Sequence, residues 1–94
     1  MKLHLSFDQF AVLYALYKAP YAYTRFDLIK ILWMPSVASR ISELRILKGF
    51  NLPLIEDSDN KKRKRYILSS LDRKKFAEYM KSDEAKLHLY KALN

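Results

Sequence analysis

The spacing of helix start signals places the strongest constraint on how this chain can fold. Ser6 is followed three residues later by Gln9, and Thr24 is followed three residues later by Asp27. At this spacing each side chain can bind a backbone N–H group that the first helical turn leaves free. The two pairs therefore predict one helix from about residue 7 and a second from about residue 25.

Apolar residues at three- and four-residue spacing predict the buried faces of these helices. In the first helix they are Phe10, Leu13, Tyr14 and Tyr17. In the second they are Leu28, Ile31 and Leu32. Ala19-Pro20 should stop the first helix. The second should end at Met34, because a residue that precedes proline is pushed out of helical geometry.

A third helix is predicted over residues 36–48. Ser36 should cap its start, and the stripe Val37, Ile41 and Leu44 should be buried. Gly49 is the only glycine of the chain. It falls where a helix commonly needs a left-handed closing residue.

Beyond Gly49 the pattern changes to that of a β-hairpin. Leu52–Glu56 is short and β-leaning, residues 57–60 form a turn cluster, and Arg65–Leu68 reads as the returning strand. Five consecutive basic residues occupy the tip and the returning arm. They are Lys61, Lys62, Arg63, Lys64 and Arg65.

Ser69-Ser70 predicts a final helix from Leu71, with Phe76, Tyr79 and Met80 on its apolar face. A second start signal at Ser82-Asp83-Glu84 predicts a break in it. An apolar stripe follows, formed by Leu87, Tyr90 and Leu93. The expected fold class is therefore mainly α with a small β-hairpin.

Composition narrows the functional classes. The net charge of +8 favours an acidic partner, which could be nucleic acid, an anionic membrane or an acidic protein. The longest apolar stretch, Phe10–Tyr17, is far shorter than the roughly 20 residues of a membrane span. The absence of cysteine fits a reducing compartment, and no secretion signal is visible, so we expect a cytoplasmic protein.

Neither a cofactor nor an enzymatic activity is expected from these residues. His4 and His88 stand at opposite ends of the chain, without a spaced carboxylate partner for a metal. The sequence also offers no nucleophile–base pair and no glycine-rich phosphate loop.

The order helix, helix, helix, hairpin, helix resembles the winged helix-turn-helix family of small bacterial, archaeal and phage DNA-binding proteins. The residues that carry the resemblance are Thr24–Leu32, Met34-Pro35-Ser36, the segment SVASRISELRILKG and the hairpin. It covers about Phe7 to Leu68. One departure is that Gly49 follows Leu44 by five residues, where the family often has four.

The resemblance implies a winged helix-turn-helix domain over residues 1–70, made of three helices and a β-hairpin wing. Residues 71–94 then form a C-terminal helical extension, packed on the domain or used to dimerise. It further implies sequence-specific binding to double-stranded DNA as a small transcription regulator of a prokaryotic cell or a virus-infected host, with helix 36–48 in the major groove. The basic wing 58–65 would lie on the backbone or in the minor groove.

The candidate DNA-binding residues are those of the exposed helix face and of the wing. They are Ser36, Ala38, Ser39, Arg40, Ser42, Glu43, Arg45, Lys61, Lys62, Arg63, Lys64 and Arg65. The small Ala38 and Ser39 would let the first helical turn approach a groove, and either arginine of the helix could reach a base edge or a phosphate. Glu43 would repel phosphate unless it accepts from a cytosine amine.

Several alternatives remain open at this stage. Arg40 and Arg45 could instead bridge to Glu43 or Asp27, and the basic run could be a solvated loop. The tyrosines and Trp33 are expected to pack in or near the core. The stripe of Leu87, Tyr90 and Leu93 could form a homodimer or pack back on the first helix.

Two other functions compete with the regulator. The chain could be a winged-helix adaptor that binds a host or partner protein, for which Ile46 and Glu43 would suit a protein surface. It could also be an architectural accessory of DNA excision or replication.

Overall fold

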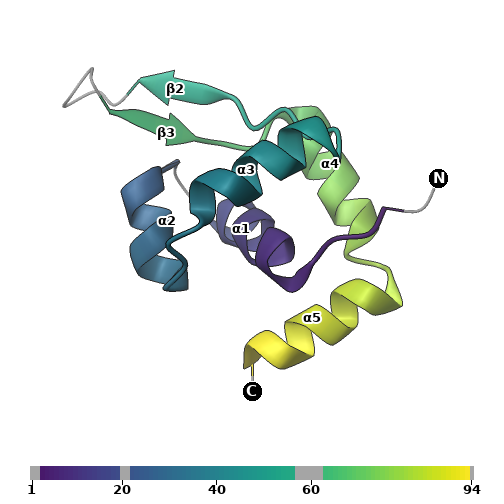
Figure 1. The fold of residues 1–94 in the computed structure, drawn as a ribbon. Coiled ribbons are helices and arrows are strands. Elements are labelled where there is room, and N and C mark those ends of the chain that lie inside the picture. The colour runs from purple at the N-terminus through teal and green to yellow at the C-terminus, as the bar shows by residue number, and fades with distance from the viewer. Residues whose placement is uncertain (1–2, 20–21, 57–62, 94) are drawn as a thin grey trace.

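The computed structural model describes residues 3–19, 22–56 and 63–93, with the side chain of Leu93 left out. These residues form a mainly helical fold with one small antiparallel sheet (Figure 1). No helix among them has the length and apolar character that crossing a membrane requires. In chain order the elements are α1 (Phe7–Lys18), β1 (Tyr23–Thr24), α2 (Arg25–Leu32), α3 (Val37–Ile46), β2 (Leu54–Glu56), β3 (Lys64–Tyr66), α4 (Ser70–Tyr79) and α5 (Asp83–Leu93).

The predicted helix starts at Ser6 and Thr24 are confirmed. The Ser6 hydroxyl accepts from the N–H of Gln9 at 3.1 Å, and Thr24 does the same for Asp27 at 3.1 Å. Ser36 does occupy the N-cap position of α3, as predicted, but its side chain makes no capping hydrogen bond. The ψ angle of Ser36 is 22°, whereas Ser6 and Thr24 are extended at 164° and 165°, the geometry that brings the hydroxyl to the first free N–H groups.

Helix α4 begins with a further reciprocal cap, between Ser69 and Asp72. Asp72 is only 2% exposed and also joins α4 to the segment after Gly49. Its carboxylate accepts from the N–H of Asn51 at 2.7 Å and of Leu52 at 2.9 Å. These bonds hold Leu52 at φ 42°, a left-handed conformation that a non-glycine residue rarely adopts.

The ends of α2 and α3 are closed by left-handed residues. Gly49 has φ 74°, as predicted. The predicted end of α2 at Met34 is wrong by two residues, because the helix ends at Leu32 and Trp33 adopts φ 53°. The N–H groups of Trp33 and Met34 both donate to the Ile29 carbonyl, which closes the helix before Pro35 is reached.

The sheet has the order β1-β3-β2, so the returning arm of the hairpin lies in its centre. Tyr66 pairs with Leu54 on one side and with Tyr23 on the other. The hairpin was predicted, although both strands are shorter than expected. Strand β1 was not predicted, because the loop before Thr24 carries no two-residue alternation long enough to indicate a strand.

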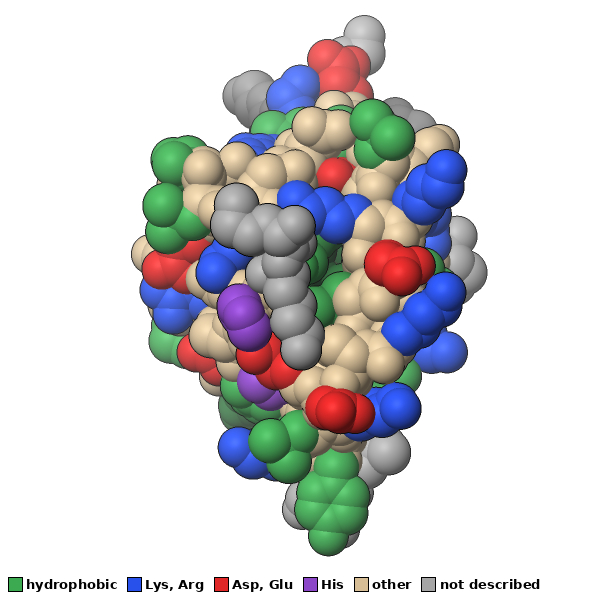
Figure 2. All heavy atoms as spheres, turned by 90° about the vertical axis from the view of Figure 1, so that its right-hand side faces the viewer, with side chains coloured by type: hydrophobic (Ala, Val, Ile, Leu, Met, Phe, Trp, Pro, Cys, Tyr) green, Lys and Arg blue, Asp and Glu red, His purple; other side chains and the backbone are tan. Residues whose placement is uncertain are grey.

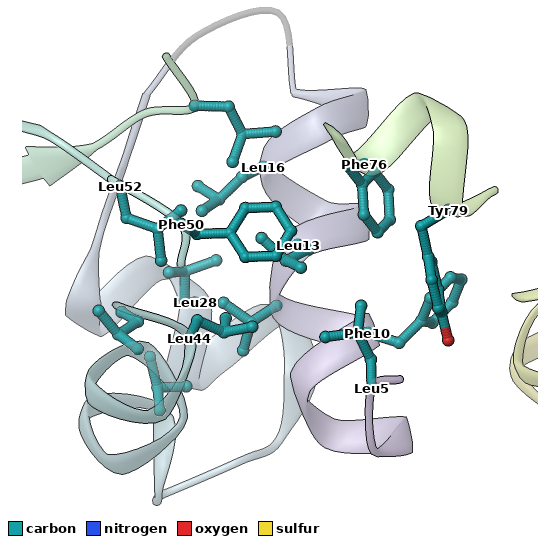
Figure 3. Packing of buried hydrophobic residues seen from close by; sticks show 14 of the residues in the cluster. Leu5, Phe10, Leu13, Leu16, Leu28, Leu44, Phe50, Leu52, Phe76 and Tyr79 are labelled. Carbon is teal, nitrogen blue, oxygen red and sulfur yellow. The ribbon is translucent and has the colours of Figure 1, made fainter. Parts of the chain in front are cut away.

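The core forms around α1, with α2, α3 and the segment before β2 on one side and α4 on the other (Figure 3). Phe50 and Leu44 point toward Leu13, while Phe76 and Tyr79 of α4 face Phe10. Phe76 is fully buried. The helices after residue 70 therefore pack on the same core as the first three helices.

Two predicted burials on and beside α2 are wrong. Ile31 is 50% exposed and Trp33 is 91% exposed. Leu28 is the only fully buried residue of this helix, because α1 and α3 cover a single narrow stripe of it. The rings of Tyr14, Tyr17 and Tyr23 do pack against the core, as expected.

Helix α5 contacts α1 through His88. The His88 ring lies between those of Phe7 and Phe10, with centroids 5.8 and 5.2 Å away. Its Nε2 lies 2.8 Å from the Leu5 carbonyl, as a donor. Leu87 and Tyr90 of the predicted stripe are 54% and 67% exposed. Packing of the stripe on the first helix and its use in a homodimer both stay predictions. The side chain of Leu93 lies outside the described residues.

Candidate nucleic-acid interface

The outward face of α3 is made of small side chains. Val37, Ile41 and Leu44 are buried, as predicted. On the opposite side Ala38, Ser39 and Ser42 are exposed, and Ile46 is 77% exposed one turn further. This face can approach a ligand closely, because none of the three exposed residues at its start extends beyond a methyl or a hydroxymethyl group.

Arg40 is held in an ion-pair network on the protein. Its Nη2 donates to Glu43 Oε2 at 2.9 Å, its Nε lies 2.9 Å from Oε1, and Asp8 lies 3.8 Å away. Glu43 also accepts from Gln9 Nε2 at 3.0 Å. The predicted alternative, a bridge from Arg40 to Glu43, is thus the arrangement present. This arrangement also explains why an acidic residue stands on α3, since the Glu43 carboxylate binds Gln9 of α1 as well as Arg40.

Arg45 connects α3 to the hairpin. Its Nη2 donates to the Leu52 carbonyl at 2.5 Å, and its guanidinium lies 5.4 Å from the centre of the Tyr66 ring. Among the described residues it bridges neither to Glu43 nor to Asp27. Both arginines of the predicted recognition helix therefore have partners within the fold.

The basic run divides into parts with different environments. Arg65 donates to the Ala22 carbonyl at 3.0 Å and lies 3.5 Å from Asp27. Lys64 is exposed and pairs with Glu56 at 3.3 Å, and Arg63 is also exposed. Lys61 and Lys62 lie outside the described residues. Arg65 thus fastens the hairpin to α2, while Arg63 and Lys64 face solvent.

The pKa of Asp27 is lowered by its own helix start and by the neighbouring basic residues of the hairpin. The backbone N–H of Thr24 contributes most to lowering the pKa of Asp27, against the opposing effect of partial burial. The Thr24 hydroxyl and the charges of Arg65 and Arg63 lower it further. The carboxylate is therefore ionised, and it pairs with Arg65 near the start of α2.

A cleft that the sequence did not predict lies between the start of α2 and the hairpin. Its volume is about 270 Å³, and its walls include the exposed cations Arg25, Arg63 and Lys64 beside the rings of Phe26 and Tyr66. Three cations around one opening favour an anionic ligand such as a phosphate group. The sequence did place Arg25 at the start of a predicted helix. It could not show that Arg25 lies beside the hairpin, because the sheet brings these two parts of the chain together.

The positive charge is not confined to the hairpin. On the face that carries α4 and the N-terminal segment, Lys and Arg side chains lie among Asp and Glu side chains (Figure 2). Arg73 and Lys74 of α4 are exposed. Within the described ranges, no three His, Asp or Glu side chains are grouped so that they could hold a metal ion.

Comparison with protein-family models, with curated proteins and with solved structures found no match for this chain.

Proposed function

We propose that this chain is a winged helix-turn-helix protein that binds double-stranded DNA and acts as a small transcription regulator. The observation that supports this best is the exposed face of small side chains on α3, next to a hairpin whose outer cations face solvent. The helix pair α2–α3 and the sheet β1-β3-β2 are compatible with that architecture.

In this proposal α3 reads bases in the major groove. The hydroxyls of Ser39 and Ser42 can donate to or accept from base edges, and Ile46 can contact a thymine methyl group. Arg40 and Arg45 keep their internal partners and set the position of the helix. The residues that read the DNA are then fewer than the sequence suggested.

Phosphate contacts come from the hairpin and from the neighbouring cleft. Arg63 and Lys64 contact the backbone from β3 and the residue before it, and Arg25 contacts it from the start of α2. The Lys64–Glu56 pair is exposed at 3.3 Å, so exchanging it for a phosphate costs little.

The test is selection from a pool of random duplexes at about 50 and 200 mM salt, where phosphate contacts change affinity strongly. One enriched motif, bound about 10³-fold more tightly than random DNA, is the expected result. Salt-sensitive binding without a motif would identify an architectural accessory instead. Absence of binding at the lower salt concentration would refute DNA as the ligand.

Charge variants locate the contacts. Replacing Arg63 and Lys64 together by alanine should weaken binding to all duplexes and reduce the log–log salt slope by about 1.8, that is about 0.9 for each phosphate contact. Lys74→Ala on α4 is the matched control, because Lys74 is exposed but lies on another element. An equal loss in both variants would contradict the assignment to the hairpin.

A further inference from the structure

Trp33 combines an exposed side chain with an unusual backbone conformation. Its side chain is 91% exposed, so its burial contributes little to folding. Its backbone has φ 53° and ψ 40°, a left-handed conformation that disfavours a side chain with a Cβ and usually selects glycine. The chain does use glycine at the equivalent end of α3, at Gly49. An observed backbone outlier of this kind is a reason to look for a function.

The Trp33 ring forms one wall of a groove. This groove has a volume of about 450 Å³ and is lined by Ile29, Lys30, Trp33 and Pro35. Phe26, which is 62% exposed, precedes Ile29 and Lys30 by three and four residues on α2, so helical periodicity places it on the same side as these two groove residues. We name this surface, formed by Phe26, Ile29, Lys30 and Trp33, the Trp33 stripe. A groove with mostly apolar walls is the kind of site into which an amphipathic helix lays its apolar face.

The charges beside the stripe are positive. Arg25 and Lys30 are exposed, whereas Asp27, the only acidic residue of α2, is bound to Thr24 and Arg65. With a net charge of +8, the chain repels a second copy of itself and attracts an acidic segment. The groove walls are mostly apolar, which suits an aliphatic or aromatic side chain better than a phosphate backbone.

We propose that the Trp33 stripe docks an acidic amphipathic helix of a partner protein. One apolar side chain of that helix enters the groove between Trp33 and Pro35, and another covers Phe26. A carboxylate on the flank of the helix pairs with Lys30. This surface is separate in composition from the small-residue face of α3, and the proposal does not depend on DNA binding.

The probe is a displayed library of peptides of about 15 residues, the length at which an amphipathic helix becomes marginally stable. It is selected against the full chain. The expected peptides carry apolar residues at three- and four-residue spacing among Asp and Glu. The best peptide free of tryptophan is then titrated, with the emission of Trp33 as the signal, because this is the only tryptophan of the chain. Docking should shift that emission to shorter wavelength.

Trp33→Gly separates folding from binding, because glycine accepts the left-handed backbone. It should fold and melt like the parent in far-UV circular dichroism, yet lose about 30-fold in peptide affinity, as when a central anchor tryptophan is truncated. Since this variant has no tryptophan, its affinity is measured by calorimetry. Trp33→Asn gives the same comparison if the glycine variant is unstable. Tyr90→Ala, on an exposed site of α5, is the control that keeps full affinity.

Several results would overturn the proposal. Selected peptides without the acidic amphipathic pattern, or peptides that bind Trp33→Gly equally well, would show that the stripe is not a docking site. If random duplex DNA shifted the Trp33 emission at low salt, and the shift disappeared at a salt concentration that prevents DNA binding, the stripe would be assigned to nucleic acid. A shift that depends only on protein concentration, together with dimerisation, would assign it to a second copy of the chain.

Discussion

Glu84 connects the N-terminal segment to both C-terminal helices. Because of these bonds, we expect the fold to lose stability when the pH becomes acidic. Its Oε1 accepts from the Leu5 N–H at 2.8 Å and from the Tyr79 hydroxyl at 2.6 Å, and its Oε2 lies 3.1 Å from His4 Nδ1. Partial burial on its own would raise the pKa of Glu84. The hydrogen bonds from Tyr79, Leu5 and His4 and the charge of His4 outweigh it and hold that pKa at about 2.

The size of the effect follows from the change in pKa. A fall from the ordinary value of 4.5 to about 2 corresponds to about 3 kcal/mol, at about 1.4 kcal/mol for each pH unit. Since the Glu84 side chain is 32% exposed, solvent screening reduces the expected contribution to about 1–2 kcal/mol. Because the folded-state pKa is the lower one, this contribution is complete above pH 4.5. It is lost as the pH falls from 4.5 toward 2.

The experiment compares Glu84→Gln with the parent in urea unfolding between pH 7 and pH 2, followed by far-UV circular dichroism. Tryptophan emission is unsuitable, because Trp33 is already exposed in the folded state. The variant should be about 1–2 kcal/mol less stable at pH 7, and the two free energies of unfolding should converge near pH 2. Glu78→Gln is the control, since its exposed pair with Lys81 should contribute less than about 0.5 kcal/mol.

Parallel loss of stability in Glu84→Gln and in the parent below pH 4.5 would refute this reasoning. It would show that other groups cause the acid sensitivity and that the Glu84 hydrogen bonds do not lower its pKa in solution.

Three further changes test other parts of the fold. Asp72→Asn should lower the free energy of unfolding in urea by about 2–3 kcal/mol, because an amide replaces a buried carboxylate that accepts from three backbone N–H groups. An unchanged urea midpoint would contradict those bonds. Gly49→Ala should lower the free energy of thermal unfolding by about 1–2 kcal/mol, because alanine disfavours a φ of 74°. The added Cβ would also lie 3.0 Å from Lys75 Nζ. A stabilised variant would contradict the left-handed backbone. Arg40→Ala should cost about 1–2 kcal/mol through its lost ion pairs. On the proposed function it should leave the preferred DNA motif unchanged, and a changed motif in duplex selection would show that Arg40 reads a base.

The helix starts could be predicted because they are local. Ser6 and Gln9, or Thr24 and Asp27, are three residues apart, so their reciprocal bonds need no other part of the chain. The end of α2 could not be predicted in the same way. Trp33 has none of the usual properties of a left-handed closing residue, and the cost of its backbone is visible only in the structure.

Of the candidate site, the sequence could predict which residues of α3 are buried and which are exposed. The buried and exposed faces followed from the periodicity of α3, but the partners of the arginines did not. The network around Arg40 includes Asp8 and Gln9, which are more than thirty residues earlier in the sequence. The pairing of β1 with β3 brings Arg65 to Asp27, which lies 38 positions earlier in the sequence.

The internal partners of Arg40 and Arg45 limit how much sequence discrimination one chain can provide on the proposed DNA. A regulator needs about 4 kcal/mol or more over random duplexes, and one bidentate arginine–guanine contact supplies about 1–3 kcal/mol of it. While both arginines remain paired, Ser39, Ser42 and Ile46 must supply the discrimination through single contacts. The remaining specificity then has to come from a second set of contacts, made by another copy on a repeated site or by a partner bound elsewhere. The exposed residues of α5 and the Trp33 stripe are the surfaces available for these two routes, so we expect selective DNA binding to depend on assembly more than on α3 alone.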